Sequence, residues 1–182
     1  MQEEIERLSR LVDGLLAVAR AEAAVPRREP VAVDVVAAER VAAWEPVARE
    51  NGQILTSSAA ERPRALLAPG DLEQVLDNVI ANALAALSAG GHVRVQTGGE
   101  RDRVRIRVVD DGPGMDEPAK QAAFRRFGHS SGAGSGLGLA IVYRLVTANG
   151  GEVRLEDTDG GGLTVAIDLP AASPNRAGPA QR

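Results

Sequence analysis

The sequence contains no cysteine and a single lysine, Lys120. Without cysteine the chain can form no disulfide, no thiolate metal site and no thiol nucleophile, which fits a cytoplasmic location. With one isolated lysine, neither a Walker-A loop nor the strand lysine of a protein kinase can be present. No apolar stretch approaches the roughly 18 residues that span a bilayer, so we expect this segment to make no direct membrane contact.

A strong charge of one sign is also missing. The formal net charge is -4, from 21 basic and 25 acidic residues that are mixed along the chain. No basic face favours nucleic acid as a partner. What the 182 residues do allow is one domain with a hydrophobic core and some extra length at the ends.

The two ends of the chain differ from its middle. Apolar residues at steps of three and four predict an amphipathic helix over residues 1–24, namely Ile5, Leu8, Val12, Leu15 and Ala19. Residues 25–30 hold two prolines and are typical of a linker, which favours a separate helix over one packed on its own domain. The tail 171–182 is rich in Pro, Ala, Gly and Ser and is predicted to be disordered.

The middle, residues 31–170, alternates between helical and strand patterns. Helices are predicted at 34–50, 71–88 and 136–148, with Asp71 as the side chain that caps the second of them. Strands are predicted at 31–34, 53–58, 65–68, 92–98, 103–110, 152–156 and 163–169. The stretch 112–135 is loop-like and too long for a plain connection, so its length predicts a functional lid.

Two asparagines, Asn78 and Asn82, lie four residues apart in the predicted helix 71–88. This spacing places both amides on one helical face. Asparagine is a poor helix former, and its amide oxygen suits Mg²⁺ that already has phosphate oxygens and waters as ligands. Hydrogen bonds to the neighbouring backbone are the alternative interpretation of this pattern.

A carboxylate ends the strand 103–110, in the segment Asp110-Asp111-Gly112-Pro113-Gly114-Met115. A carboxylate at that place can accept a hydrogen bond from an exocyclic amine, which would distinguish adenine from guanine. Gly112 and Gly114 allow the backbone to turn sharply and approach a flat ring. The alternative is an ordinary tight turn.

Glycines open the predicted helix 136–148, in Gly134-Ser135-Gly136-Leu137-Gly138. They expose unpaired N–H groups at the positive end of the helix dipole, where phosphate binds favourably. A dinucleotide-binding fold would need a preceding strand, and here the predicted lid precedes. The alternative is that these glycines form a flexible hinge, which is compatible with a phosphate site because a lid needs hinges.

In their order and spacing these three motifs resemble the Bergerat ATP-binding fold. Phe124-Arg125-Arg126-Phe127 resembles the phenylalanine box of its sensor histidine kinase branch. Two later segments, Asn149-Gly150-Gly151 and Leu169-Pro170, also resemble motifs of that branch. The resemblance covers 31–170. It implies an α+β two-layer sandwich, a mixed sheet of about five strands packed on three helices, preceded by an N-terminal amphipathic helix. Residues 1–24 resemble the second helix of the dimerisation and phosphoacceptor domain.

The resemblance assigns roles to individual residues. It makes Asn82 the principal Mg²⁺ ligand and Asn78 its helper near the phosphates. Asp110 would hold the adenine amine, with Gly112, Gly114 and Met115 beside the ring. The backbone of Gly134, Gly136, Leu137 and Gly138 would meet the phosphates as the lid, residues 115–135, closes.

Other lid residues and the last strand complete this implied site. Phe124 and Phe127 would pin the lid, and Arg125 or Arg126 could reach the terminal phosphate. Thr164 would complete the adenine contact through water. The sequence departs from the family at Ala85, where a basic residue is common, so the phosphate charge must be neutralised by another group.

The implied reaction is ATP-dependent phosphorylation of a histidine in two-component signal transduction. Where related ATPases have a glutamate that activates water, this chain has Asn78, and an amide is a poor base. Neither His92 nor His129 resembles the acceptor, so we expect a catalytic fragment that phosphorylates a histidine on a dimerisation helix absent from this chain. The implied partners are that helix pair, a second copy in the full-length homodimer, and a response regulator.

Three alternatives stay open at this point. One is an ATPase of the gyrase, chaperone and mismatch-repair type, and another is an anti-sigma serine kinase on the same fold. The third is a degenerate module that binds a nucleotide or a partner without kinase activity, which the departure at Ala85 keeps possible.

Overall fold

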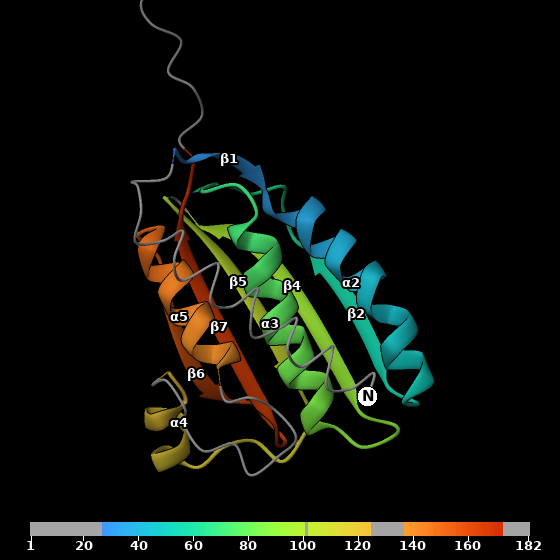
Figure 1. Cartoon of the computed structure of the whole chain (residues 1–182). Helices are drawn as coiled ribbons and strands as arrows, with labels where there is room; N and C mark the ends of the chain where they lie inside the picture. Colours follow the sequence, from blue (N-terminus) through green and yellow to red (C-terminus); the bar gives the residue numbers. More distant parts are fainter. Residues whose placement is uncertain (1–26, 101, 125–136, 173–182) are drawn as a thin grey trace, which may run out of the picture.

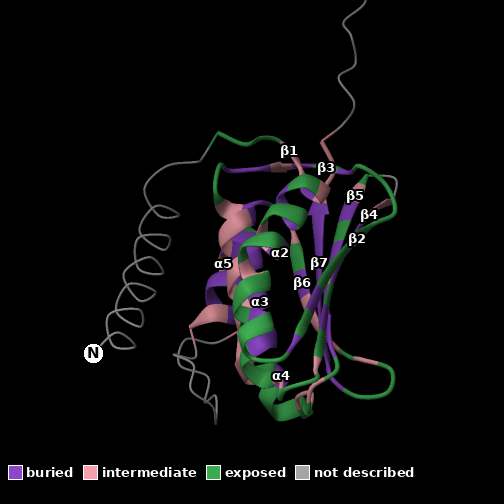
Figure 2. Cartoon of the chain, turned by 90° about the vertical axis from the view of Figure 1, so that its right-hand side faces the viewer, coloured by how far each residue is buried: buried purple, intermediate pink, exposed green. Residues whose placement is uncertain are grey.

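The structure is a computed structural model that describes residues 27–100, 102–124 and 137–172. Three helices lie side by side over one face of a five-stranded sheet (Figure 1). Seen from the side, helices and strands form two layers, and the buried residues lie between them (Figure 2). This arrangement confirms the predicted α+β two-layer sandwich.

The main sheet is mixed, with the strand order β2-β4-β5-β7-β6. Only the β2–β4 pair of this sheet is parallel, and the other three pairs are antiparallel. The five strands are β2 (Ile54–Ala59), β4 (His92–Glu100), β5 (Arg103–Asp110), β6 (Glu152–Asp157) and β7 (Leu163–Pro170). Two short strands, β1 (Glu29–Ala32) and β3 (Arg64–Leu67), pair separately at one end of the domain.

The three helices of the second layer are α2 (Val33–Glu50), α3 (Asp71–Ala86) and α5 (Gly138–Ala148). A fourth, α4 (Glu117–Ala123), lies beyond the sheet at the end where β6 and β7 meet (Figure 1). Among the described residues, none of the helices is long and apolar enough to cross a membrane.

The core forms where alternating strand residues meet the apolar stripes of the helices. In β5, Val104, Ile106 and Val108 are at most 1% exposed and face the helices. In α3, seven buried residues recur at helical spacing: Leu72, Val75, Leu76, Val79, Ile80, Ala83 and Leu84. Because this buried stripe fixes the rotation of α3, it also determines where the polar residues of the helix point.

Two expectations need correction or extension. Asp71 does not cap α3, since Gly70 is the N-cap residue and the helix has no side-chain cap. Gly70 has a left-handed φ of 83°, so the chain turns there and Asp71 becomes the first helical residue. The loop-like stretch 112–135 contains the short helix α4. Asp116 is its N-cap residue, and the Asp116 side chain accepts a hydrogen bond from the N–H of Ala119. The predicted N-terminal helix, the first two residues of the predicted linker and most of the tail lie outside the described residues. The last two residues of the predicted linker, Glu29 and Pro30, belong to β1, and Ala171 of the predicted tail pairs with Ala65.

Candidate functional site

Asp110, the last residue of β5, is a buried carboxylate whose oxygens have different surroundings. Its side chain is 5% exposed. Both backbone hydrogen bonds reach the same oxygen, Oδ1, from the N–H groups of Gly112 and Leu163, each at 3.0 Å. Oδ2 accepts no hydrogen bond from a described residue. Asp110 is thus held through one oxygen and presents the other as an acceptor.

The pKa of Asp110 reflects this position. Burial raises the pKa, and the negative charge of Asp111 raises it further. The two backbone hydrogen bonds lower it, although not enough to offset burial. A donor at Oδ2, such as an exocyclic amine, would therefore stabilise the ionised form.

Glycines surround Asp110 at very short range. A Cβ at Gly162 would lie 2.0 Å from the backbone oxygen of Asp110, and the φ of Gly162 is +106°, so no other residue fits there. Gly114 also has a positive φ, +72°, and a Cβ there would lie 3.0 Å from the oxygen of Gly162. The turn after β5 and the turn before β7 therefore touch through backbone alone.

The second cluster joins α3 to the start of α5. A Cβ at Gly138 would lie 2.9 Å from Nδ2 of Asn82 and 3.3 Å from Oδ1 of Asn78. The backbone at the first residue of α5 therefore lies directly against both amides. This contact brings together two motifs that lie more than 50 residues apart in the sequence.

The two amides have unequal hydrogen bonding. Nδ2 of Asn78 donates to the backbone oxygen of Gln74 at 2.8 Å, which orients its Oδ1 away from that bond. Asn82 is exposed and forms no hydrogen bond with any residue that the structure describes. The alternative that these asparagines only bond to neighbouring backbone therefore applies to Nδ2 of Asn78 alone. The oxygens of both amides are available to bind a ligand.

One turn of α3 connects the two clusters. A Cβ at Gly112 would lie 3.2 Å from Cδ2 of Leu87 and 3.5 Å from the oxygen of Ala86, at the end of α3. Ala86 is four residues after Asn82, about 6 Å along a helix. Asp110 and the amide pair therefore lie near the same end of α3.

The amide pair fits a divalent cation that brings its own ligands. Within the described ranges, no group of three or more His, Cys, Asp or Glu side chains could hold a metal ion. Mg²⁺ keeps several waters and is usually bound by few protein oxygens together with phosphate. The oxygens of Asn82 and Asn78 match that requirement because they lie beside a helix start that favours phosphate.

The described part of the predicted lid is anchored at both ends. Met115, Phe124 and Leu137 are partly buried and pack against the core, and the rings of Phe124 and Tyr143 are 5.4 Å apart. Nζ of Lys120 contacts Glu117 at 2.9 Å and Asp157, at the end of β6, at 2.8 Å. Five predicted site residues lie outside the described residues: Arg125, Arg126, Phe127, Gly134 and Gly136.

Thr164 is not brought to Asp110. It pairs with Val109, so strand alternation places its side chain on the sheet face opposite Asp110, where its hydroxyl lies 2.9 Å from that of Thr158. The group that reaches Asp110 from β7 is the N–H of Leu163. No site role was predicted for Leu163 or Gly162, and the run Gly160-Gly161-Gly162 was the one signal that backbone approaches closely there.

Asp111 and His92 form a separate pair beside the site. The N–H and Nδ1 of His92 lie 2.7 and 2.9 Å from the two oxygens of Asp111. These hydrogen bonds lower the pKa of Asp111. His92 is thus engaged at the start of β4, and Ala85 is exposed on α3.

Comparison with known proteins gives a consistent result. Residues 68–173 match the family model described as "Histidine kinase-, DNA gyrase B-, and HSP90-like ATPase". A sensor protein KdpD from Rathayibacter rathayi is 39% identical over 170 residues, which is 91% of this chain and 20% of the relative. The chain spans a fifth or less of the length of the KdpD sensor proteins that it matches.

Solved structures share the fold. Full-length ShkA in complex with AMPPNP has a TM-score of 0.81 at 32% identity, covering 93% of this chain and 37% of ShkA. Histidine kinase ThkA in complex with the response regulator protein TrrA has a TM-score of 0.74 at 20% identity, covering 92% of this chain and 49% of ThkA. The second likeness concerns the fold alone.

Proposed function

Because the chain belongs to the histidine kinase-, DNA gyrase B- and HSP90-like ATPase family, we propose that it binds Mg-ATP and phosphorylates a histidine on a separate dimerisation helix. The transferred group is the γ-phosphoryl of ATP. The bond from the γ-phosphorus to the bridging oxygen breaks, ADP leaves, and a phosphorus–nitrogen bond forms on the imidazole, which loses its proton.

One observation carries this proposal: the backbone of Gly138 lies against both Asn78 and Asn82. It places the N–H groups at the start of α5 beside two amide oxygens. Phosphate oxygens bind N–H groups, and a hard cation binds amide oxygens. The arrangement therefore suits a phosphate chain with a bound Mg²⁺ better than either ligand alone.

Adenine is assigned to the other cluster. Oδ2 of Asp110 accepts the 6-amino group, while Gly112 and Gly114 bring backbone close to the ring and Met115 lies beside it. The 6-oxo group of guanine would instead face the carboxylate with another acceptor. Asp110 thus selects the base, and the amide pair positions the phosphates.

The chain's own residues position the reactants and balance charge. Phosphoryl transfer needs little else, because the transition state is stabilised mainly by alignment and by neutralisation of the phosphate oxygens. Bound Mg²⁺ would supply part of that neutralisation through Asn82 and Asn78. We assign another part to Arg126 in the lid, since Ala85 offers no charge.

The acceptor is a histidine and not water. No described carboxylate occupies the place one turn before Asn82, where Asn78 stands instead. An amide cannot take a proton from water effectively, so hydrolysis should be slow. The AMPPNP complex of ShkA supports the nucleotide class.

We extend the proposal to the rest of the chain and its partners. We assign residues 1–24 to the second helix of the dimerisation domain, the segment before β1 to the linker, and 31–170 with its lid at 115–135, together with β1 and Ala171, to the catalytic domain. The full-length protein is a homodimer that acts in the cytoplasm. Its phosphohistidine passes the group to a response regulator, a partnership for which the ThkA–TrrA complex is the precedent.

The test supplies the acceptor in a longer protein that carries both dimerisation helices joined to this chain. We expect γ-labelled ATP to give an acid-labile, base-stable label on the histidine. Asn82→Ala should abolish labelling, and Ser88→Ala, an exposed change just after α3, should not alter it. Saturation with nucleotide without any labelled histidine would contradict the kinase proposal, and fast steady-state hydrolysis would favour an ATPase.

A further inference from the structure

The end of α5 farthest from the proposed phosphate site is tied to the start of α3 through Asn149. This side chain is 1% exposed. Its Nδ2 donates to Oδ2 of Asp71 at 2.6 Å and to the backbone oxygen of Leu145 at 2.8 Å. Its Oδ1 accepts from the N–H of Ala68 at 2.9 Å. Three of the four hydrogen bonds open to an amide are therefore made within the protein.

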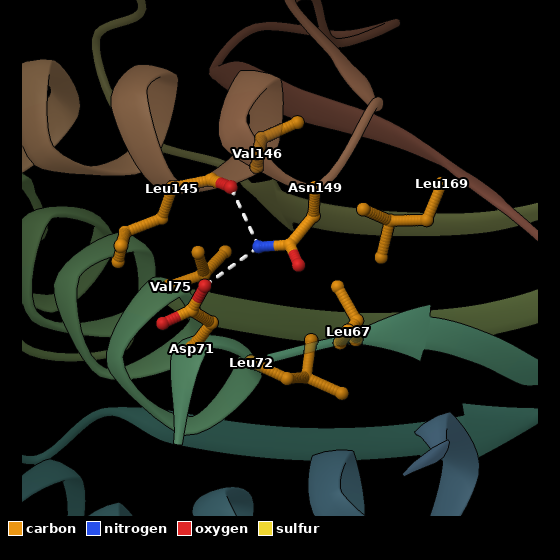
Figure 3. A pocket seen from close by; sticks show the side chains of 8 residues that line it. All are labelled: Leu67, Asp71, Leu72, Val75, Leu145, Val146, Asn149 and Leu169. Carbon is orange, nitrogen blue, oxygen red and sulfur yellow. Dashed lines mark hydrogen bonds between the residues drawn. The ribbon is translucent and has the colours of Figure 1, made fainter. Parts of the chain in front are cut away.

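The surroundings of this contact are apolar and nearly without free space. Figure 3 shows Asn149 pointing toward Asp71 between leucine and valine side chains that come from β3, α3, α5 and β7. The cavity there measures about 10 Å³, at the lower limit for one water molecule. A bridging water cannot readily replace the amide, so the position of α5 depends on direct contact.

The two helices run in opposite directions, with a polar contact at each end of the pair. Asn149 meets Asp71 at one end, and Gly138 meets Asn78 and Asn82 at the other. The 11 residues of α5 span about 16 Å, so a small tilt at Asn149 displaces the start of the helix. At 2.9 Å from Asn82, a Cβ at Gly138 would have no free space, so the second contact is sensitive to such a displacement.

We infer that Asn149 is a positioning residue for nucleotide binding: by holding the end of α5 to Asp71, it sets the gap between Gly138 and the two asparagines. This inference rests on the proposed ATP-binding function. Asn149 does not itself touch the nucleotide. The gap that it sets is the one in which the start of α5 meets phosphate and the amide oxygens meet the metal.

The test is a double-mutant cycle on the affinity for an ATP analogue with Mg²⁺, measured by calorimetry on folded protein. We expect Asp71→Ala to weaken binding by about tenfold and Asn149→Ala by at least as much, because the second change also removes the hydrogen bonds to Ala68 and Leu145. The double variant should bind no more weakly than Asn149→Ala, because the contact between the two side chains is already lost in that variant. Asp71→Asn keeps an acceptor oxygen for Nδ2 and should keep the wild-type affinity.

Two controls separate positioning from loss of stability. Leu55→Ala removes a core side chain in β2, distant from α5, and should lower the melting temperature without changing affinity. Arg28→Ala removes an exposed hydrogen bond to Ala148 at the same helix end and should have little effect. The inference would be overturned if Asn149→Ala bound the analogue with wild-type affinity. If that variant does not fold, wild-type affinity in Asp71→Ala would overturn it.

The outcome also distinguishes this inference from the function on which it rests. Wild-type protein that shows no Mg²⁺-dependent binding would remove both. Wild-type protein that binds while the single variants bind equally well would overturn the role of Asn149 alone. Additive losses in the cycle would likewise contradict one shared contact.

Discussion

At the residue scale, Asp110 combines two requirements that oppose each other. Burial raises its pKa, yet the proposed selection of adenine over guanine requires an ionised acceptor at Oδ2. Two backbone N–H groups on Oδ1 hold the carboxylate in place. The residue therefore costs stability in the empty site when it is ionised, as binding residues commonly do.

Asp110→Asn tests base selection directly. The amide oxygen can keep both backbone hydrogen bonds, while a donor replaces Oδ2. We expect affinity for ATP to fall about 100-fold and affinity for GTP to rise relative to ATP, because an amide N–H suits a 6-oxo group. Competitive calorimetry with both nucleotides measures this. The melting temperature at pH 7 should not fall, since the variant removes a buried charge.

Gly162→Ala tests the close approach of the two turns. A Cβ there would overlap the backbone oxygen of Asp110, so we expect a loss of about 3 kcal/mol or more in the free energy of unfolding. Gly160→Ala is the matched control, because Gly160 has a φ of +90° but open space around it. That change should cost only about 1 kcal/mol in urea unfolding. Equal losses in the two variants would contradict the account.

Candidate site residues were recognisable in the sequence where a side chain defines the motif. Asn78, Asn82 and Asp110 stand in recognisable motifs, and the structure brings the first two to Gly138. The roles of Leu163 and Gly162 depend on backbone N–H and on the absence of a side chain, which residue type does not reveal. Thr164 lies away from Asp110 for a related reason: a shift of one position along a strand moves a side chain to the other face.

At the element scale, α5 links the amide pair, which its first residue contacts, to the start of α3, which Asn149 contacts. Its glycine at the first position is a poor helix former, yet it allows the approach to Asn82. Helix propensity and site geometry therefore favour different residues at this position.

Gly138→Ala separates the two effects. Stability should change by less than about 1 kcal/mol, and in the favourable direction, because alanine forms helix better. The affinity for Mg-ATP analogue should fall about tenfold, because the new Cβ displaces the amides of Asn82 and Asn78. Thr147→Ala, near the exposed end of the same helix, should leave affinity unchanged. Unaltered affinity in Gly138→Ala would contradict the placement of the phosphates.

The existence of the elements was predictable from periodicity, and their ends were less so. The pattern in α3 placed the helix correctly, but Asp71 was taken as its cap. In the structure the carboxylate of Asp71 accepts a hydrogen bond from Asn149, 78 residues away, a contact that no local pattern contains. The helix α4 was missed because it is seven residues long and lies inside a stretch of loop-like composition.

At the scale of the whole molecule, the sheet has a polar face away from the helices. There Asp168 of β7 lies between Arg105 of β5 and Arg154 of β6, at 2.8 and 2.6 Å. Burial raises the pKa of Asp168, but hydrogen bonds and charge from the two arginines outweigh it and the pKa is lowered. Three adjacent strands are thus joined by one carboxylate.

Asp168→Asn should reveal this contribution through its pH dependence. Because the folded pKa is lowered, the stabilisation is present above the ordinary value of 3.8 and is lost as the pH falls through the folded pKa. We expect a loss of about 1–2 kcal/mol at pH 7, since both arginines are more than a third exposed, and a vanishing difference in acid. Glu39→Gln, which changes an exposed carboxylate of α2, is the control and should alter stability little at any pH. A pH-independent difference would refute the ionic origin.

The central claim is that Asp110, Asn78, Asn82 and Gly138 bound one Mg-ATP site. Calorimetric titration of this chain and of Asp110→Ala with a non-hydrolysable ATP analogue, with and without Mg²⁺, tests it most directly. We predict binding by the wild-type chain that Mg²⁺ strengthens at least about tenfold, and loss of binding in the variant. Absence of binding at millimolar nucleotide, or binding that is indifferent to both Mg²⁺ and Asp110, would contradict the claim.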